Sequence, residues 1–238
     1  MKAVILAGGK GSRLYPYTTI LPKPLMPIGE IPILEHLFRR LKTSGITDVV
    51  LAIGYLGELI EAYYGNGSKI GMNITYSRET TPLGTAAPIT LLSNTIKEAF
   101  LVMNGDLLCD VDFEKLVKFH YQEKPEVTIG SYNKSHKMGL GVLDIDENSQ
   151  LIGYREKPEH NYLVSMGIYV MEPTVFQYLE QSKKADLPDL INMLIKNKQK
   201  VITYEHKGFW LDIGTHKDYE IALTELSHNP DFCVREIV

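Results

Sequence analysis

A short apolar strand runs directly into a glycine-rich turn at the start of this chain, and that junction constrains the fold most. Residues 2–6 are apolar apart from Lys2, and residues 7–13 read AGGKGSR. Glycines leave backbone N–H groups open, so such a turn can surround phosphate oxygens. Arg13 and Lys23, which stands between two prolines, add cations for a polyanion. The junction therefore predicts a strand that ends at a triphosphate-binding turn.

Apolar strand patterns alternate with helical patterns along most of the chain. The strands are expected at residues 2–6, 49–53, 73–77, 100–103, 127–131, 165–171 and 201–205. Regular alternation of this kind indicates a parallel sheet with helices on both faces. We predict an α/β, Rossmann-like three-layer sandwich with a mostly parallel central sheet. The expected domain covers residues 1–228, and residues 229–238 are expected to form a tail.

The alternation stops between residues 133 and 165. Residues 140–145 and 151–154 read as a hairpin around Asp146-Glu147-Asn148. We predict a small inserted β region here, placed over the active site on the sugar-binding side of the sheet.

Composition excludes several classes of protein. The net charge of -4 argues against nonspecific nucleic-acid binding, which needs a basic face. The two cysteines are too few for a disulfide framework. The first apolar run is too short for a signal peptide or a membrane span. We therefore expect a cytoplasmic protein without nucleic-acid or membrane partners. A homodimer is left open, with residues 30–45 or the tail as its contact.

The apolar run of residues 100–103 stops at Asn104-Gly105-Asp106, which places the carboxylate of Asp106 at the end of another strand. Ligands of open α/β sheets bind at the carboxyl ends of strands, so Asp106 and the glycine turn are expected to share one crevice. Asp110 and Asp112 are competitors for the role of Asp106, although Asp112 also suits a helix cap. The turn has neither GxxxxGK[ST] nor GxGxxG spacing, so it is neither a P-loop nor a dinucleotide turn.

Six segments then occur in one order along the chain. They are residues 6–25 with the pattern GGxGxRLxPxTxxxPKPL, Glu79 with Pro82-Leu83-Gly84-Thr85-Ala86, Asn104-Gly105-Asp106, Glu156-Lys157-Pro158, Gly167-Ile168-Tyr169, and Trp210-Leu211-Asp212-Ile213-Gly214-Thr215. Together they resemble the sugar-1-phosphate nucleotidylyltransferases, also called NDP-sugar pyrophosphorylases, in a short form without a C-terminal β-helix. The resemblance runs from residue 1 to about residue 220.

The resemblance implies Mg²⁺-dependent transfer of a nucleotidyl group from a nucleoside triphosphate to a sugar-1-phosphate. Arg13 would hold the β- and γ-phosphates, Lys23 would contact the α-phosphate, and Asp106 and Asp212 would share the Mg²⁺. Lys10 is a weaker candidate for the triphosphate. The nucleotide side would consist of Leu6, Ala7, Gly8, Gly9, Gly11, Ser12, Glu79, Pro82, Gly84 and Thr85. The acceptor side would consist of Asn104, Gly141, Glu156, Lys157, Ser165 and Gly167.

The family motifs favour a mannose-1-phosphate guanylyltransferase-like activity. Cytidylyl, uridylyl or thymidylyl transfer stays open. The sugar-side strand departs from the family's Asn-Ala-Gly or Asn-Thr-Gly, because it reads Ser165-Met166-Gly167. That departure leaves room for another sugar phosphate, or for a polyol phosphate such as glycerol phosphate. A non-catalytic subunit that binds an NDP-sugar is the alternative of another class.

Overall fold

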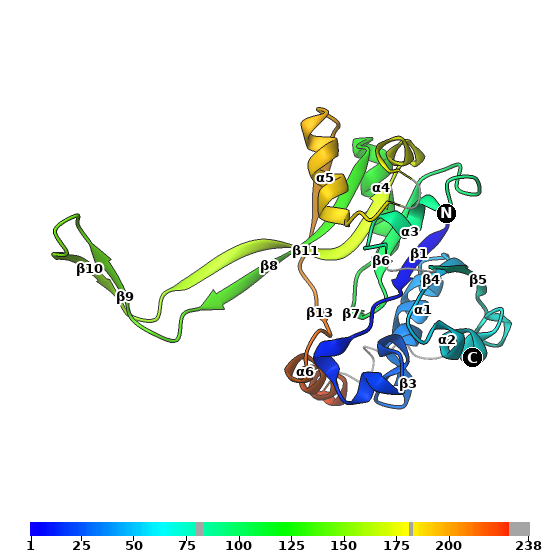
Figure 1. Ribbon diagram of the computed structural model, residues 1–238, viewed down its shortest axis with the longest axis horizontal. Coiled ribbons are helices and arrows are strands. Elements are labelled where there is room, and N and C mark those ends of the chain that lie inside the picture. Colours follow the sequence, from blue (N-terminus) through cyan, green and yellow to red (C-terminus); the bar gives the residue numbers. More distant parts are fainter. Residues whose placement is uncertain (80–82, 181–182, 229–238) are drawn as a thin grey trace.

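A seven-stranded sheet forms the centre of the computed structural model, which describes residues 1–79, 83–180 and 183–228 (Figure 1). In spatial order its strands are β12 (Val201–His206), β8 (Val127–Lys137), β11 (Glu159–Met171), β6 (Phe100–Asn104), β1 (Ala3–Ala7), β4 (Asp48–Ile53) and β5 (Asn73–Arg78). Neighbouring strands are parallel except where β11 pairs antiparallel with β6 and β8. The predicted mostly parallel α/β fold is confirmed.

β1 lies between β4 and β6, and this position defines the ligand side of the sheet. After β1 the chain forms β4 and β5 on one side of β1, and it then crosses to form β6 on the other side of β1. The loops after β1 and β6 therefore diverge from neighbouring strand ends. Such a reversal of strand order opens a crevice outside the carboxyl ends of the strands. The glycine turn and Asp106 both follow strands that end there.

Apolar side chains alternate between the two faces of the sheet, and each face is covered by helices. Ile5 faces α1 (Ile33–Thr43), α2 (Gly57–Tyr64) and α4 (Phe113–Glu123). Val4 faces the other layer, which holds α3 (Ala87–Thr90), the 3-10 segment η5 (Pro173–Tyr178) and α5 (Leu187–Lys196). The period of two within each strand thus produces the three layers.

A smaller cluster lies beside the ligand side. It joins the 3-10 segments after β1 to the last helix, α6 (His216–His228). The other short elements are η1 (Ser12–Leu14), η2 (Tyr17–Thr19), η3 (Lys23–Leu25), β2 (Pro27–Ile28), β3 (Ile31–Pro32), η4 (Ser68–Ile70), β7 (Leu107–Cys109) and β13 (Trp210–Asp212). β7 and β13 pair antiparallel, which brings Asp212 opposite Leu107. Sequence analysis did not predict either strand.

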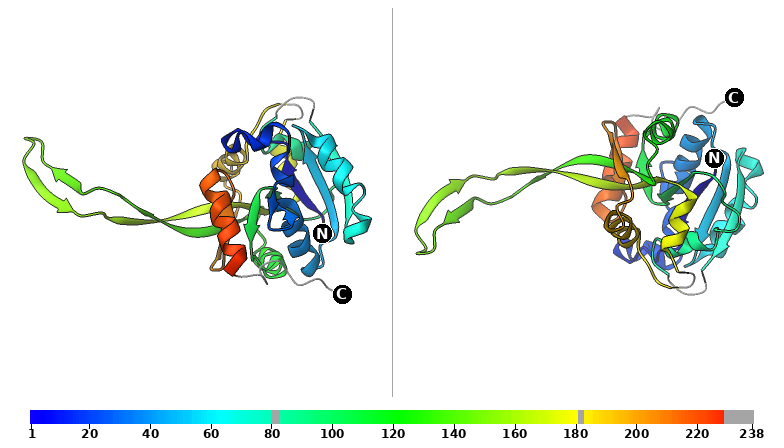
Figure 2. Two further views of the ribbon diagram at one scale, coloured as in Figure 1. Left: turned by 90° about the horizontal axis from the view of Figure 1, so that it is seen from below. Right: turned by 90° about the horizontal axis from the view of Figure 1, so that it is seen from above.

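The inserted β region is present, but it projects from the molecule rather than covering the crevice. Beyond the sheet, β8 and β11 continue as a two-stranded ribbon that carries β9 (Val142–Ile145) and β10 (Leu151–Arg155) at its far end. Figures 1 and 2 show this ribbon extending away from the helices and the sheet in all three views. From the Ser131–Ser165 pair to the Lys137–Glu159 pair, β8 and β11 stay paired without a break, and this stretch carries the hairpin outward.

Within the described residues, no helix is long and apolar enough to cross a membrane.

Candidate active site

The turn after β1 is held against the turn after β4. Tyr55 donates its backbone N–H to the Gly8 carbonyl at 3.2 Å. A Cβ on Gly54 would lie 2.9 Å from the Gly8 oxygen, and one on Gly8 would lie 3.2 Å from Glu79 Oε1. This close approach of two backbones excludes a side chain on Gly54. Sequence reasoning missed Gly54, although a glycine directly after the strand at 49–53 was a usable signal.

The following loop folds over Lys23. Gly11 has φ +60°, and Thr18 Oγ1 donates to its carbonyl at 3.0 Å. A Cβ on Gly11 would come within 3.0 Å of the Thr18 methyl group and within 3.2 Å of Lys23 Cβ. The glycine therefore lets the loop pack onto the lysine stem. Gly9 and Ser12 are exposed on the loop, where their backbone can meet a ligand.

Lys23 connects the two aspartates that the sequence predicts as metal ligands. Its side chain is only 8% exposed, and its ammonium donates a hydrogen bond to Asp106 Oδ2. The same nitrogen lies 4.0 Å from Asp212 Oδ1. The backbone also joins these segments, since Ile213 donates to the Asp106 carbonyl at 3.0 Å. Two strand ends far apart in sequence thus form one charged cluster.

The two carboxylates retain unused oxygens. Asp106 Oδ1 and Asp212 Oδ1 are buried from solvent and accept no hydrogen bond. Burial, and then the nearby charge of Asp106, raise the pKa of the Asp212 carboxyl, while Lys23 and Arg13 oppose that rise. Buried oxygens without partners are costly unless a ligand or an ion satisfies them. The described residues hold no group of three or more metal-ligating side chains, so a cation here would depend on ligands from the substrates.

Arg13 lies at the open rim of the same cluster. A Cβ on Gly214 would be 3.3 Å from both terminal guanidinium nitrogens of Arg13, so that glycine makes room for the guanidinium. Arg13 is exposed, which leaves its planar fork open to a polyanion. The loop is tied to α6, because the His216 ring nitrogen Nε2 hydrogen-bonds the Tyr15 carbonyl at 2.8 Å.

The two competing aspartates have structural partners. Asp110 accepts from the Phe209 backbone N–H at 2.8 Å and hydrogen-bonds His206 at 2.7 Å. Asp112 caps α4 by accepting from the Lys115 backbone N–H at 3.0 Å. These contacts favour Asp106 over both competitors at the crevice.

The segment predicted to contact the base follows β5. Glu79 accepts the Leu83 backbone N–H at 3.0 Å, and its burial raises its pKa. Gly84 has φ +87°, and a Cβ there would be 2.5 Å from the Ala185 carbonyl. Thr85 donates its backbone N–H to Asp186 Oδ1 at 2.9 Å. Gly84 and Thr85 thus attach this segment to the start of α5. The predicted contact Pro82 lies outside the described residues.

On the acceptor side, three predicted residues lie around the bulge in β11. Gly167 has φ +71°, and a Cβ there would be 2.5 Å from Asn104 Nδ2. Ser165 Oγ lies 3.0 Å from the Tyr169 hydroxyl oxygen. Trp210 donates its indole N–H to the Met166 carbonyl at 3.0 Å, which links this bulge to the strand of Asp212. Asn104 and Gly167 therefore adjoin the aspartate cluster.

The other three acceptor-side residues lie on the ribbon. A Cβ on Gly141 would be 3.2 Å from Glu156 Oε2, and Lys157 Nζ lies 3.7 Å from Glu156 Oε1. The three are neighbours of one another near the base of the β9–β10 hairpin. Since the ribbon points away from the sheet, the structure does not bring them to the aspartate cluster of the same chain (Figure 2).

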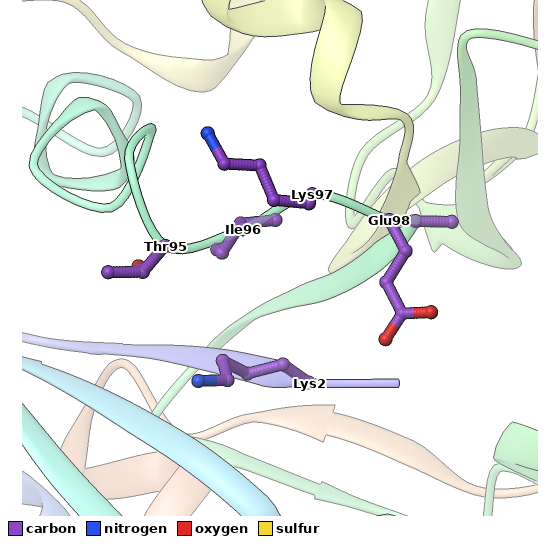
Figure 3. Close-up of a pocket in the computed structure, with 6 residues that line it drawn as sticks. Lys2, Thr95, Ile96, Lys97 and Glu98 are labelled. Carbon is purple, nitrogen blue, oxygen red and sulfur yellow. The ribbon is translucent and has the colours of Figure 1, made fainter.

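A separate hollow of about 360 Å³ opens near the amino end of β1. Its walls include Lys2, Lys97 and Glu98, which Figure 3 shows on neighbouring segments. The hollow lies at the opposite strand ends from the glycine turn, whereas sheets of this type bind ligands at the carboxyl ends. It does not belong to the predicted crevice.

Comparison with known proteins agrees with this architecture. Residues 2–229 match the model of the nucleotidyl transferase family. The chain therefore belongs to the nucleotidyl transferase family.

Two similar proteins are named as mannose-1-phosphate guanylyltransferases. Over 92% of its length the chain is 34% identical to the mannose-1-phosphate guanyltransferase of Saccharomyces cerevisiae. It is also 34% identical to the mannose-1-phosphate guanylyltransferase catalytic subunit beta of Drosophila melanogaster. The chain spans 63% and 60% of the lengths of these two relatives.

Solved structures show the same fold. A putative glucose-1-phosphate thymidylyltransferase from Bacillus anthracis, in complex with sucrose, superposes with a TM-score of 0.76 at 28% identity, and 94% of each chain is covered. HddC from Yersinia pseudotuberculosis superposes with a TM-score of 0.75 at 24% identity, covering 94% of this chain and 99% of that one.

Proposed function

We propose that this chain transfers a guanylyl group from GTP to mannose 1-phosphate and releases pyrophosphate. The observation that carries the proposal is the cluster of Lys23, Asp106 and Asp212 at the carboxyl ends of the strands, beside a turn of exposed glycine backbone. The names of the curated relatives support GTP and mannose 1-phosphate as the substrate pair.

In this reaction an oxygen of the acceptor phosphate attacks the α-phosphorus of the triphosphate. A new P–O bond forms, the bond between the α-phosphorus and its bridging oxygen breaks, and pyrophosphate leaves with the electron pair. The sugar phosphate is already ionised at neutral pH, so no dedicated general base is required. Catalysis then depends on positioning two polyanions and on stabilising charge at the α-phosphate.

The residues of the crevice suit these tasks. The glycine turn offers backbone N–H groups to the triphosphate. Arg13 can hold the β- and γ-phosphates through its planar fork, because it is exposed at the rim. Lys23 would contact the α-phosphate, and its buried stem and its ion pair with Asp106 fix the position of its ammonium. A preorganised cation of this kind stabilises developing charge without having to reorganise.

Asp106 and Asp212 are proposed to hold Mg²⁺. Their buried oxygens without hydrogen-bond partners fit a hard cation that takes few carboxylates together with phosphate oxygens and water. The ion would neutralise phosphate charge and orient the two substrates. Lys23, which contacts both carboxylates, would keep them apart and oriented until the ion binds.

A matrix assay tests the proposal: purified protein, Mg²⁺, each of five nucleoside triphosphates, and a panel of sugar-1-phosphates and polyol phosphates including glycerol phosphate. We expect pyrophosphate release to be fastest with GTP and mannose 1-phosphate. If another pair reacts faster, the proposed substrates are wrong, but nucleotidyl transfer remains the reaction class. Binding of an NDP-sugar without release from any pair would favour the non-catalytic subunit.

A further inference from the structure

The ribbon is long enough to remove its far end from the crevice of its own chain. Residues 132–164, called the arm from here on, continue the β8–β11 pairing from Ser131–Ser165 out to Lys137–Glu159 without a break. Six residues of strand at about 3.3 Å each place the end of that pairing about 20 Å from its base. Because backbone hydrogen bonds join both strands along this length, the arm cannot fold back without losing them.

The far end of the arm exposes an unusual share of apolar surface. Nine of the twenty large hydrophobic side chains that are exposed in the described residues lie between positions 138 and 163. Four of them are cross-strand partners on one face of the β9–β10 hairpin, where they are 54–60% exposed: Leu143, Ile145, Leu151 and Tyr154. A two-stranded hairpin is marginally stable on its own and needs a surface to pack against. The arm therefore has the composition of a contact surface.

The arm also carries Lys157, whose backbone and neighbouring side chains are held in a defined conformation. Lys157 has φ +45°, an uncommon backbone conformation for a residue with a side chain. Its neighbour Glu156 accepts a hydrogen bond from the Tyr154 hydroxyl at 2.9 Å. A Cβ on Gly141 would lie 2.3 Å from the Tyr154 hydroxyl oxygen, so only glycine leaves room for that hydrogen bond. The Lys157 ammonium lies 3.7 Å from Glu156 Oε1, and because the Lys157 side chain is 55% exposed, this surface pair leaves the ammonium accessible to a ligand.

We propose that two copies of this chain exchange arms, so that the partner subunit's Lys157 binds the acceptor phosphate in each crevice. This inference rests on the proposed function, because it assigns the acceptor phosphate to the same crevice. Within the crevice, two cations lie near Asp212: Lys23 and Arg13. The proposed mechanism uses both of them to bind the triphosphate. A second polyanion would need a further cation, and the arm supplies one that its own chain cannot use.

A second copy fits the arm better than an unrelated partner does. The arm of each chain points away from the crevice of that chain. In a pair of copies, the arm of each one can therefore reach the crevice of the other. A two-fold axis makes this exchange closed, with the two arms antiparallel and the base of each beside the end of the other. The apolar hairpin faces would be covered in the same assembly.

The first test is the mass of the protein in solution. We expect a dimer by light scattering at micromolar concentration. We also expect a monomer when residues 138–158 are replaced by Asn-Gly, a two-residue turn that suits the Lys137–Glu159 pair. A monomeric parent protein would overturn the proposal whether or not the protein is active. A shortened variant that remains dimeric would place the contact elsewhere and also overturn it.

The second test is complementation between two inactive variants. Asp106→Asn and Lys157→Ala chains carrying different tags are co-expressed, and the mixed dimer is isolated through both tags. With exchanged arms, one crevice of the mixed dimer is intact and the other has both defects, so we expect about half of the wild-type rate. If Lys157 acts within its own chain, both crevices are defective and the mixed dimer is inactive, which would overturn the proposal.

Two controls separate this inference from the proposed function. In a mixed dimer of Asp106→Asn and Asp212→Asn, each crevice lacks one aspartate of its own chain. This dimer should be inactive whether or not the arms are exchanged. A doubly tagged wild-type dimer must release pyrophosphate. If it does not, the proposed function fails, and the arm exchange is then decided by the mass measurement alone.

Discussion

Among the described residues, Lys23 is the only one whose charged group lies within 4.0 Å of both Asp106 and Asp212, and replacing it with methionine removes that charge while keeping most of the volume of the side chain. Removing one partner of a buried ion pair costs about 3–5 kcal/mol. Here the side chains of Asp106 and Asp212 are 26% and 44% exposed, so water stabilises them once the lysine is lost. Because this solvation offsets part of the cost, we expect the free energy of unfolding to fall by about 1–3 kcal/mol.

The same change should affect catalysis more than stability. A positioned cation at developing phosphate charge contributes about 100- to 1000-fold in rate, as donors of oxyanion holes do. Urea unfolding and pyrophosphate release measure the two effects on one preparation. Lys2→Met, whose side chain lies at the opposite strand ends, is the matched control and should retain wild-type activity. A Lys23→Met protein that unfolds like wild type and turns over within threefold of it would refute the assignment of Lys23.

Three further predictions address other parts of the molecule. Asp106→Asn should abolish Mg²⁺-dependent pyrophosphate release and leave the circular dichroism spectrum unchanged, and near-wild-type turnover would contradict the metal assignment. Gly167→Ala should cost about 1–2 kcal/mol, because φ is positive and the new Cβ displaces the Asn104 amide, and it should raise KM for the acceptor more than KM for the triphosphate. Burial lowers the pKa of His120, despite its hydrogen bond to Glu172, so the folded state binds fewer protons than the unfolded state and loses stability as pH falls through about 6.5. The Tm of His120→Gln should fall less than that of wild type between pH 7.5 and 5.5, and equal falls would refute this cause.

The core of the crevice was predictable from the sequence because strand ends in a parallel sheet meet at one edge. The apolar runs of residues 3–7 and 100–103 stop at Gly8 and Asn104, which was enough to place Gly8 and Asp106 together. Asp212 could be added only through family resemblance. Its position depends on β13 pairing with β7, and three-residue strands leave no readable period.

The course of the arm was not predictable. The strand and turn patterns between residues 133 and 165 indicated β structure, and they did so correctly. However, a strand pattern does not state whether its exposed face meets the same chain, another chain or water. The close approach at Gly54 was missed for a related reason, since it depends on the packing of two loops and not on a local pattern.

Isotope transfer from labelled GTP tests the central claim most directly. GTP labelled at the α-phosphorus or at the γ-phosphorus is incubated with mannose 1-phosphate, Mg²⁺ and protein, and the products are separated. Nucleotidyl transfer predicts that the α label appears in the sugar nucleotide and the γ label in pyrophosphate, and that neither moves without the acceptor. Release of the γ label as inorganic phosphate, or equal release of pyrophosphate without the acceptor, would contradict the account.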